Sequence, residues 1–152
     1  MKTIQVQNGD IQLDTGGKLV FLQGSQKLIQ DLSLWLQEDL GAGYTTPNFG
    51  STLNSLIGGP NIESTVAMIQ SEVQRILGLY QAQQLLDLQS AQSKAALSNW
   101  NKSEIINQIN SVTAEQSYSS VIVNVSLTTL ANVTMSLKII VDPTSGVQVT
   151  NG

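Results

Sequence analysis

The chain has 152 residues, of which 41% are hydrophobic and 12% charged, with a formal net charge of −4, so its length fits one domain that buries a core. Because no basic patch is visible and cysteine and histidine are absent, we expect no nucleic-acid binding, no disulfide or thiolate chemistry, and no histidine base or metal ligand. The start lacks a signal-peptide core and no apolar run approaches a membrane span, so we expect a protein made in the cytoplasm with no membrane partner.

The first residues predict a β-hairpin. Apolar and polar residues alternate on both sides of Asn8-Gly9, a dipeptide that tolerates the positive φ of a primed turn. A second turn at residues 15–18 leads into an extended run, 19–22. So short a sheet must lie on something larger. It either covers part of the same chain or forms an arm that embraces a neighbour.

Two helices are predicted next. Ser25 is placed to cap the first, which Gly41 ends, and the helical spacing of Trp35 makes it a core anchor rather than a ligand platform. The loop 41–50 is dense in turn residues. A short helix, 51–57, follows it.

The longest predicted helix spans residues 61–97, with Pro60 and Asn61 at its start. Its apolar positions recur at steps of three and four, which places them on one stripe. One interpretation is an ordinary core helix, and the other is an intermolecular bundle. In the second interpretation, the partner-helix interface consists of Ile62, Val66, Ile69, Val73, Ile76, Leu77 and Tyr80.

The last third predicts an antiparallel sheet. Residues 121–128 and 133–141 alternate strictly, as strands with one buried face do. Residues 105–112 form a less regular strand, and 147–149 a short one. We therefore expect one α+β domain, with N-terminal strands and helix at 1–60, the long helix at 61–100 and the sheet at 101–152.

Several segments in fixed order carry a family resemblance. Asp10-Ile11, Gly24 and Gln30 are followed by a helix ending near Asp39, by Pro47-Asn48-Phe49-Gly50-Ser51-Thr52-Leu53 and by Leu56-Ile57-Gly58. This order resembles the baseplate wedge family of contractile phage tails, sometimes described as lysozyme-like, over roughly residues 10–141. The most specific piece is the loop with Pro47, Phe49 and Gly50. A Glu-Pro-Arg turn typical of the family is replaced after Trp100 by Asn101-Lys102-Ser103-Glu104.

The resemblance implies a structural protein of the virion tail baseplate, assembled in the host cytoplasm into a hetero-oligomeric ring with other wedge proteins. It also implies that the sheet is similar to the interlocking domain of tail-sheath subunits and receives sheath strands, which starts the sheath. Spacing alone indicates a sheet with few charges and a possible open edge, unless the N-terminal hairpin covers that edge. The expected sheath-strand interface consists of Val121, Val123, Val125, Val133, Met135, Leu137 and Ile139.

The alternative function is a tail-associated peptidoglycan hydrolase, and a weaker one is a cytoplasmic adaptor that never enters the particle. A hydrolase needs two carboxylates across a sugar-sized gap. The candidates are Glu38, Asp39, Glu63, Glu72 and Glu104. Glu38 and Asp39 point about 100° apart on a helix, and the others sit singly. We therefore expect no enzyme, no catalytic residues, no metal site and no cofactor.

Overall fold

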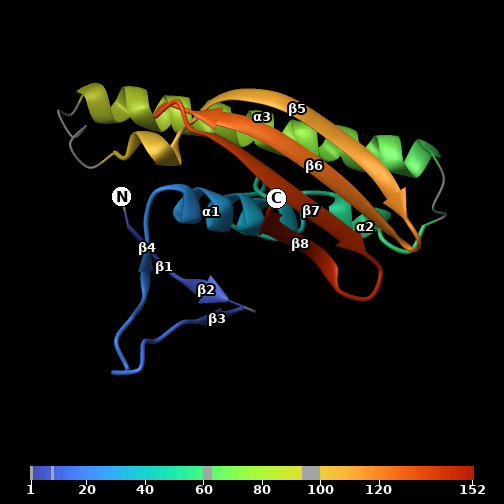
Figure 1. Ribbon diagram of the computed structural model, residues 1–152, viewed down its shortest axis with the longest axis horizontal. Coiled ribbons are helices and arrows are strands. Elements are labelled where there is room, and N and C mark those ends of the chain that lie inside the picture. Colours follow the sequence, from blue (N-terminus) through green and yellow to red (C-terminus); the bar gives the residue numbers. More distant parts are fainter. Residues whose placement is uncertain (1, 8, 60–62, 94–99) are drawn as a thin grey trace.

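The computed structural model describes residues 2–7, 9–59, 63–93 and 100–152. Small N-terminal strands, a long central helix and a four-stranded antiparallel sheet follow one another along the chain (Figure 1). This arrangement confirms the predicted α+β class.

The sheet is a meander whose strands lie in sequence order. It consists of β5 (Ile106–Ser117), β6 (Ser120–Thr129), β7 (Thr134–Asp142) and β8 (Gly146–Asn151). The predicted strands are therefore confirmed, but β5 continues well past residue 112. It does so because its second half pairs with β6 up to Ser117 and Ser120, across a two-residue turn.

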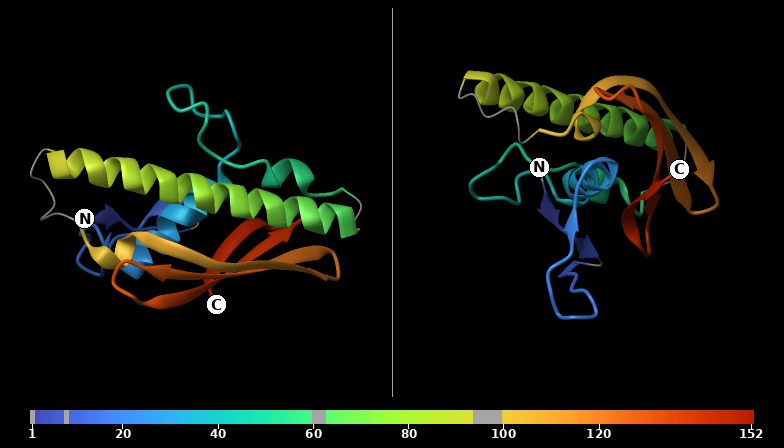
Figure 2. Two further views of the ribbon diagram at one scale, coloured as in Figure 1. Left: turned by 90° about the horizontal axis from the view of Figure 1, so that it is seen from above. Right: turned by 60° about the vertical axis from the view of Figure 1, so that its left-hand side comes forward.

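Two helices cover one face of the sheet (Figure 2). Helix α3 (Glu63–Ser93) lies along β5 and β6, and α1 (Ser25–Gln37) lies against β8. The alternation of β6 and β7 is confirmed, because Val123, Leu127 and Ile139 are fully buried under these helices. Burial of such side chains drives folding, at about 1.5–3 kcal/mol each.

Helix α1 begins and ends differently from the prediction. Gly24, with φ of 67°, occupies the cap position without a side-chain cap, so the prediction that Ser25 caps the helix was wrong. The N–H of Gly24 instead donates to Oε1 of Glu104 at 2.8 Å. The helix stops at Gln37 rather than at Gly41, because Glu38 turns extended and its carbonyl accepts the N–H of Ser51 at 2.8 Å.

The loop that starts at Glu38 returns through Ser51 to the short helix α2 (Leu53–Leu56), within the predicted 51–57. The predicted long helix is described as α3 from Glu63 onward, and its expected start at residues 60–62 lies outside the described part. After residue 100 a single turn of 3-10 helix, η2 (Lys102–Glu104), is capped by Asn101, whose side chain accepts the N–H of Ser103.

The N-terminal strands form two small ribbons. β1 (Thr3–Ile4) pairs with β4 (Phe21–Leu22), and β2 (Val6–Gln7) pairs with β3 (Asp10–Ile11). The second pair is the predicted hairpin, although Asn8 itself lies outside the described residues. Neither ribbon joins the four-stranded sheet by strand pairing, although residues of the ribbons line a groove together with Val147 and Val149 of β8. The ribbons project from the body beside α1 (Figure 1).

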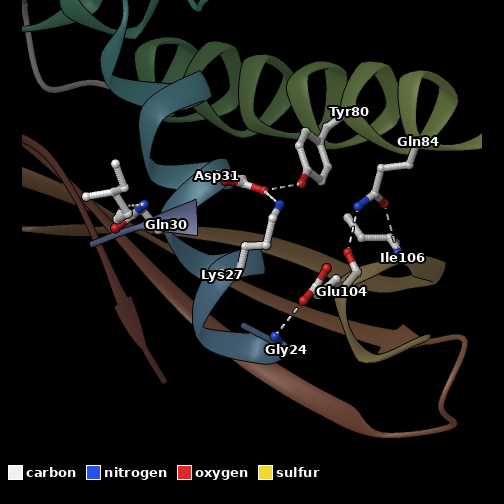
Figure 3. Close-up of polar contacts among 9 residues, drawn as sticks. Gly24, Lys27, Gln30, Asp31, Tyr80, Gln84, Glu104 and Ile106 are labelled. Atoms are coloured by element: carbon white, nitrogen blue, oxygen red, sulfur yellow. Dashed lines mark hydrogen bonds and ion pairs between the residues drawn. The ribbon is translucent and has the colours of Figure 1, made fainter. Parts of the chain in front are cut away.

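Two glutamine amides attach extended segments to the helices (Figure 3). Gln30 of α1 accepts from the N–H of Val6 at 2.8 Å and donates to the carbonyl of Ile4 at 2.9 Å. Gln84 of α3 accepts from the N–H of Ile106 at 2.9 Å and donates to the carbonyl of Glu104 at 2.6 Å. Each amide thus binds residues i and i+2 as a neighbouring strand would.

We predict that Gln84→Met lowers the free energy of unfolding by about 2–4 kcal/mol, because two buried backbone groups lose their partners at about 1–3 kcal/mol each. Urea denaturation followed by circular dichroism measures the change. The matched control is Gln83→Met: among the described contacts its amide donates to Asp87 at the surface, and its loss should cost below about 0.5 kcal/mol. Equal effects of the two substitutions would show that the hydrogen bonds of the Gln84 amide contribute nothing to the free energy of unfolding.

Candidate strand-binding edge

The sheet has two edges, and they differ in how well they are protected. β6 and β7 have a strand on each side, so only β5 and β8 present unpaired backbone groups. Edge strands can accept a strand from another chain unless charge, proline, a bulge or another element blocks them. The comparison of β5 with β8 therefore identifies where another chain can add a strand.

The β5 edge is covered over its first half. Gln81 of α3 donates from Nε2 to the carbonyl of Asn107 at 2.8 Å, and Gln70 does so to the carbonyl of Val112 at 3.0 Å. Register shifts interrupt the same stretch, and Glu115 adds a charge further along. These are the devices that natural sheets use against edge-to-edge pairing.

The β8 edge lacks most of these devices. Gly152 donates its N–H to the carbonyl of Ser136 on β7. Along an antiparallel pair, every second residue is hydrogen-bonded to the partner strand, and the backbone groups of the residues between point away from it. The backbone groups that point away from β7 are therefore those of Val147, Val149 and Asn151. One of these groups is covered, because Gln37 donates from Nε2 to the carbonyl of Val147 at 3.0 Å. Strand β8 contains no charged residue and no proline. The groups of Val149 and Asn151 are therefore available for pairing.

The open edge faces a groove of about 600 Å³. One wall is β8, with Val147 and Val149, and the other walls come from α1 and from the N-terminal ribbon. None of the described residues that line the groove is charged. Glutamine amides dominate its polar part: Gln5, Gln7, Gln26, Gln30 and Gln37. An uncharged groove beside a free strand edge suits an extended backbone, since amides both donate and accept hydrogen bonds.

The predicted partner-helix interface lies inside the molecule. Ile69, Val73, Ile76 and Leu77 are at most 2% exposed, and Tyr80 is 7% exposed. Val66 is half-buried against the same core, and Ile62 lies outside the described residues. The prediction that this stripe binds partner helices is therefore corrected. The chain's own sheet and α1 already cover it.

The predicted sheath-strand residues lie on the two central strands. Val121, Val123, Val125, Leu137 and Ile139 are buried in the core, and Met135 is partly buried. Val133 precedes β7 and is 52% exposed. Since β6 and β7 are already paired on both sides, an added strand would pair beside β5 or β8 instead.

The loop that carries the family-like motif is structural in this chain. The ring of Phe49 packs edge-to-face on Trp35, with centroids 4.7 Å apart. Gly50 has φ of 104°, and a Cβ there would stand 2.7 Å from the carbonyl oxygen of Glu38. Pro47 is exposed. Phe49 and Gly50 thus hold the loop against α1, where only glycine fits the return of the chain.

The candidate carboxylates are dispersed. Glu38, Asp39 and Glu63 are exposed, whereas Glu104 is 3% exposed. Glu72 accepts two bonds from Arg75, and these bonds hold its pKa below the ordinary value. A general acid of a glycosidase needs the opposite shift. In the described part of the chain no three acidic or other metal-binding side chains lie so that they could hold a metal ion, and no helix has the length and apolar character needed to cross a membrane.

Sequence reasoning missed the groove and Gln37, although one signal was present. In a meander of four strands, the first and the last strands are the edges. The segment 146–151 contains no charged residue, which indicates that it is the less protected of the two edge strands. The hydrogen bond from Gln37 spans 110 positions along the chain, and no local pattern predicts it.

Comparison of the chain with protein-family models, with curated proteins and with solved structures finds no match. Its function is therefore inferred from the sequence pattern and from the geometry of the β8 edge.

We predict that Glu72 stabilises the fold in a pH-dependent way. Glu72 binds Arg75 and also accepts the N–H of Thr52 at 2.7 Å. Because the pKa of Glu72 is lowered from its ordinary value of 4.5, its contribution is complete above that pH and is lost as the pH falls through the folded-state pKa. The free energy of unfolding of Glu72→Gln should thus fall below that of the wild type at pH 7, and the two should converge in acid. A gap that stays constant down to pH 2 in urea titrations would contradict this role.

Proposed function

We propose that the chain is a structural component of a contractile-tail baseplate wedge, and that it initiates the tail sheath by accepting a sheath strand beside β8. The observation that carries this proposal is the open, uncharged β8 edge beside a groove whose described lining contains no charged residue. The ordered motifs from Asp10 to Ile57 support the same assignment through their resemblance to the wedge family. The partners are then a tail-sheath protein and other wedge proteins, within a ring of the virion.

The mechanism is strand addition. Main-chain bonds to Val149 and Asn151 set the register of the incoming strand, and its inward side chains lie over the half-buried Ile29 and beside Val147. Burial of that apolar surface supplies affinity at roughly 25 cal/mol per Å² before the cost of ordering the strand. The sheet would gain a fifth strand without rearranging the four it has.

Contacts with other wedge proteins need a different surface, because the stripe of α3 is buried. The N-terminal ribbons offer one. Four large apolar side chains of this N-terminal arm are 44–58% exposed: Ile11, Leu13, Leu19 and Phe21. Exposed apolar side chains that lie close together often mark a protein–protein contact. We assign the wedge contacts to this arm, in keeping with its projection from the body (Figure 2).

The proposal is tested with two proline substitutions on neighbouring residues. Val149→Pro removes an N–H that points away from β7, so most of the stability should remain while strand addition stops. Gln148→Pro removes an N–H that points toward β7, and should cost about 3 kcal/mol of stability. Thermal unfolding of both variants checks the orientation of the strand.

Binding is then measured by pull-down of the tagged chain from cells that co-express its neighbouring tail genes, with mass spectrometry of the captured proteins. We expect the wild type to recover sheath and wedge proteins, and Val149→Pro to recover wedge proteins alone. Sheath capture that is equal for the wild type and Val149→Pro would contradict strand addition at β8.

A further inference from the structure

A second cleft, of about 410 Å³, lies on a different face of α1 from the β8 groove. Its walls come from α1, from α3, from the loop before α2 and from the segment that starts at Trp100. Both tryptophans of the chain line it, together with Phe49 and Tyr80. Concave sites lined by aromatic side chains and a few polar groups are typical of ligand-binding sites.

The aromatic wall is held in fixed geometry. Trp35 packs edge-to-face with Phe49 and with Tyr80, at centroid distances of 4.7 and 5.6 Å. The hydroxyl of Tyr80 donates to Oδ2 of Asp31 at 3.1 Å, which holds the ring at its hydroxyl end (Figure 3). Rings held by such contacts present their faces and edges to a ligand without first having to be ordered.

The charges around the cleft are mostly negative. Among the described residues that line it, Asp31, Asp87 and Glu104 are acidic and Lys27 is basic. Lys27 is paired with Asp31 one turn away, and Glu104 is 3% exposed and accepts the N–H of Gly24, so the exposed carboxylate of the cleft is that of Asp87. Burial, and then the charge of Asp31, raise the pKa of Tyr80 well above its ordinary value, and the phenol stays a neutral donor.

We propose that this cleft receives an arginine side chain from a partner protein segment. A guanidinium stacks on aromatic faces, donates in several directions to carboxylates, and loses hydration more readily than an ammonium does. Trp35 and Trp100 supply the aromatic surface. Asp87, an exposed carboxylate on α3 that binds only Gln83 among the described contacts, supplies the counter-charge at the mouth.

This site is distinct from the strand-binding groove, since Lys27, Asp31 and Trp35 line the cleft and Gln26 and Gln30 line the groove, with Leu34 between them lining both. A partner strand at β8 leaves the aromatic cleft open. The cleft thus adds a second point of attachment, which recognises a charged side chain, whereas the β8 edge binds the main chain.

The test uses the peptide acetyl-Ala-Arg-Ala-amide and its neutral isostere with citrulline in place of arginine. Both tryptophans line the cleft, so their indole N–H signals in NMR spectra of the whole chain report binding there alone. We expect the arginine peptide to shift both signals in a saturable way and to bind about tenfold more tightly than the citrulline peptide, as charge-assisted stacking predicts.

Asp87→Asn should weaken the arginine peptide about threefold, the effect of losing one exposed charge pair. Glu63→Gln removes the same charge at the other end of α3 and should leave the affinity unchanged. The proposal is overturned if the two peptides bind equally, if neither shifts the indole signals, or if Asp87→Asn and Glu63→Gln weaken binding to the same extent.

Discussion

The packing of α3 along β5 is the constraint on which the other features of this fold depend. Its apolar stripe is buried against the sheet, and its glutamine amides bind the outer backbone of β5 at Asn107 and Val112. The first half of one edge of the sheet is thereby occupied by the chain's own helix. The opposite edge, β8, is left beside the shorter α1, where a groove remains. A helix that covers the sheet and protects the first half of one edge favours strand addition at the other.

Side-chain amides explain how so weakly charged a chain holds its segments in place. Gln30 and Gln84 each bind two backbone groups of an extended segment, and Gln37 binds a third strand at Val147. An amide can donate and accept at once, so it substitutes for a neighbouring peptide group without bringing a charge that would need its own partner. Glutamine amides also line the groove beside β8. They can bind the backbone of a peptide segment whether that segment is charged or neutral.

Periodicity predicted the elements of this fold, because it depends only on which residues share a face. The alternation of Val121–Val141 and the stripe from Val66 to Tyr80 were read correctly as a sheet and a helix with buried faces. The partner of each face was not predictable, since a stripe looks the same whether its own sheet or another protein covers it. The burial of Glu104 also escaped, because its partner Gly24 lies 80 positions away. The clefts depend on such long-range contacts, and the sequence alone does not reveal them.

Amide hydrogen exchange, read residue by residue with and without the bound sheath subunit, tests the central claim most directly. In the free chain, the N–H groups of Val149 and Asn151 should exchange fast, while those of Gln148 and Thr150 are protected by their pairing with β7. Binding should protect Val149 and Asn151 and leave β5 unchanged. Protection that appears along β5 instead, with Val149 and Asn151 still exchanging fast in the complex, would contradict the assignment of β8 as the edge that accepts a strand.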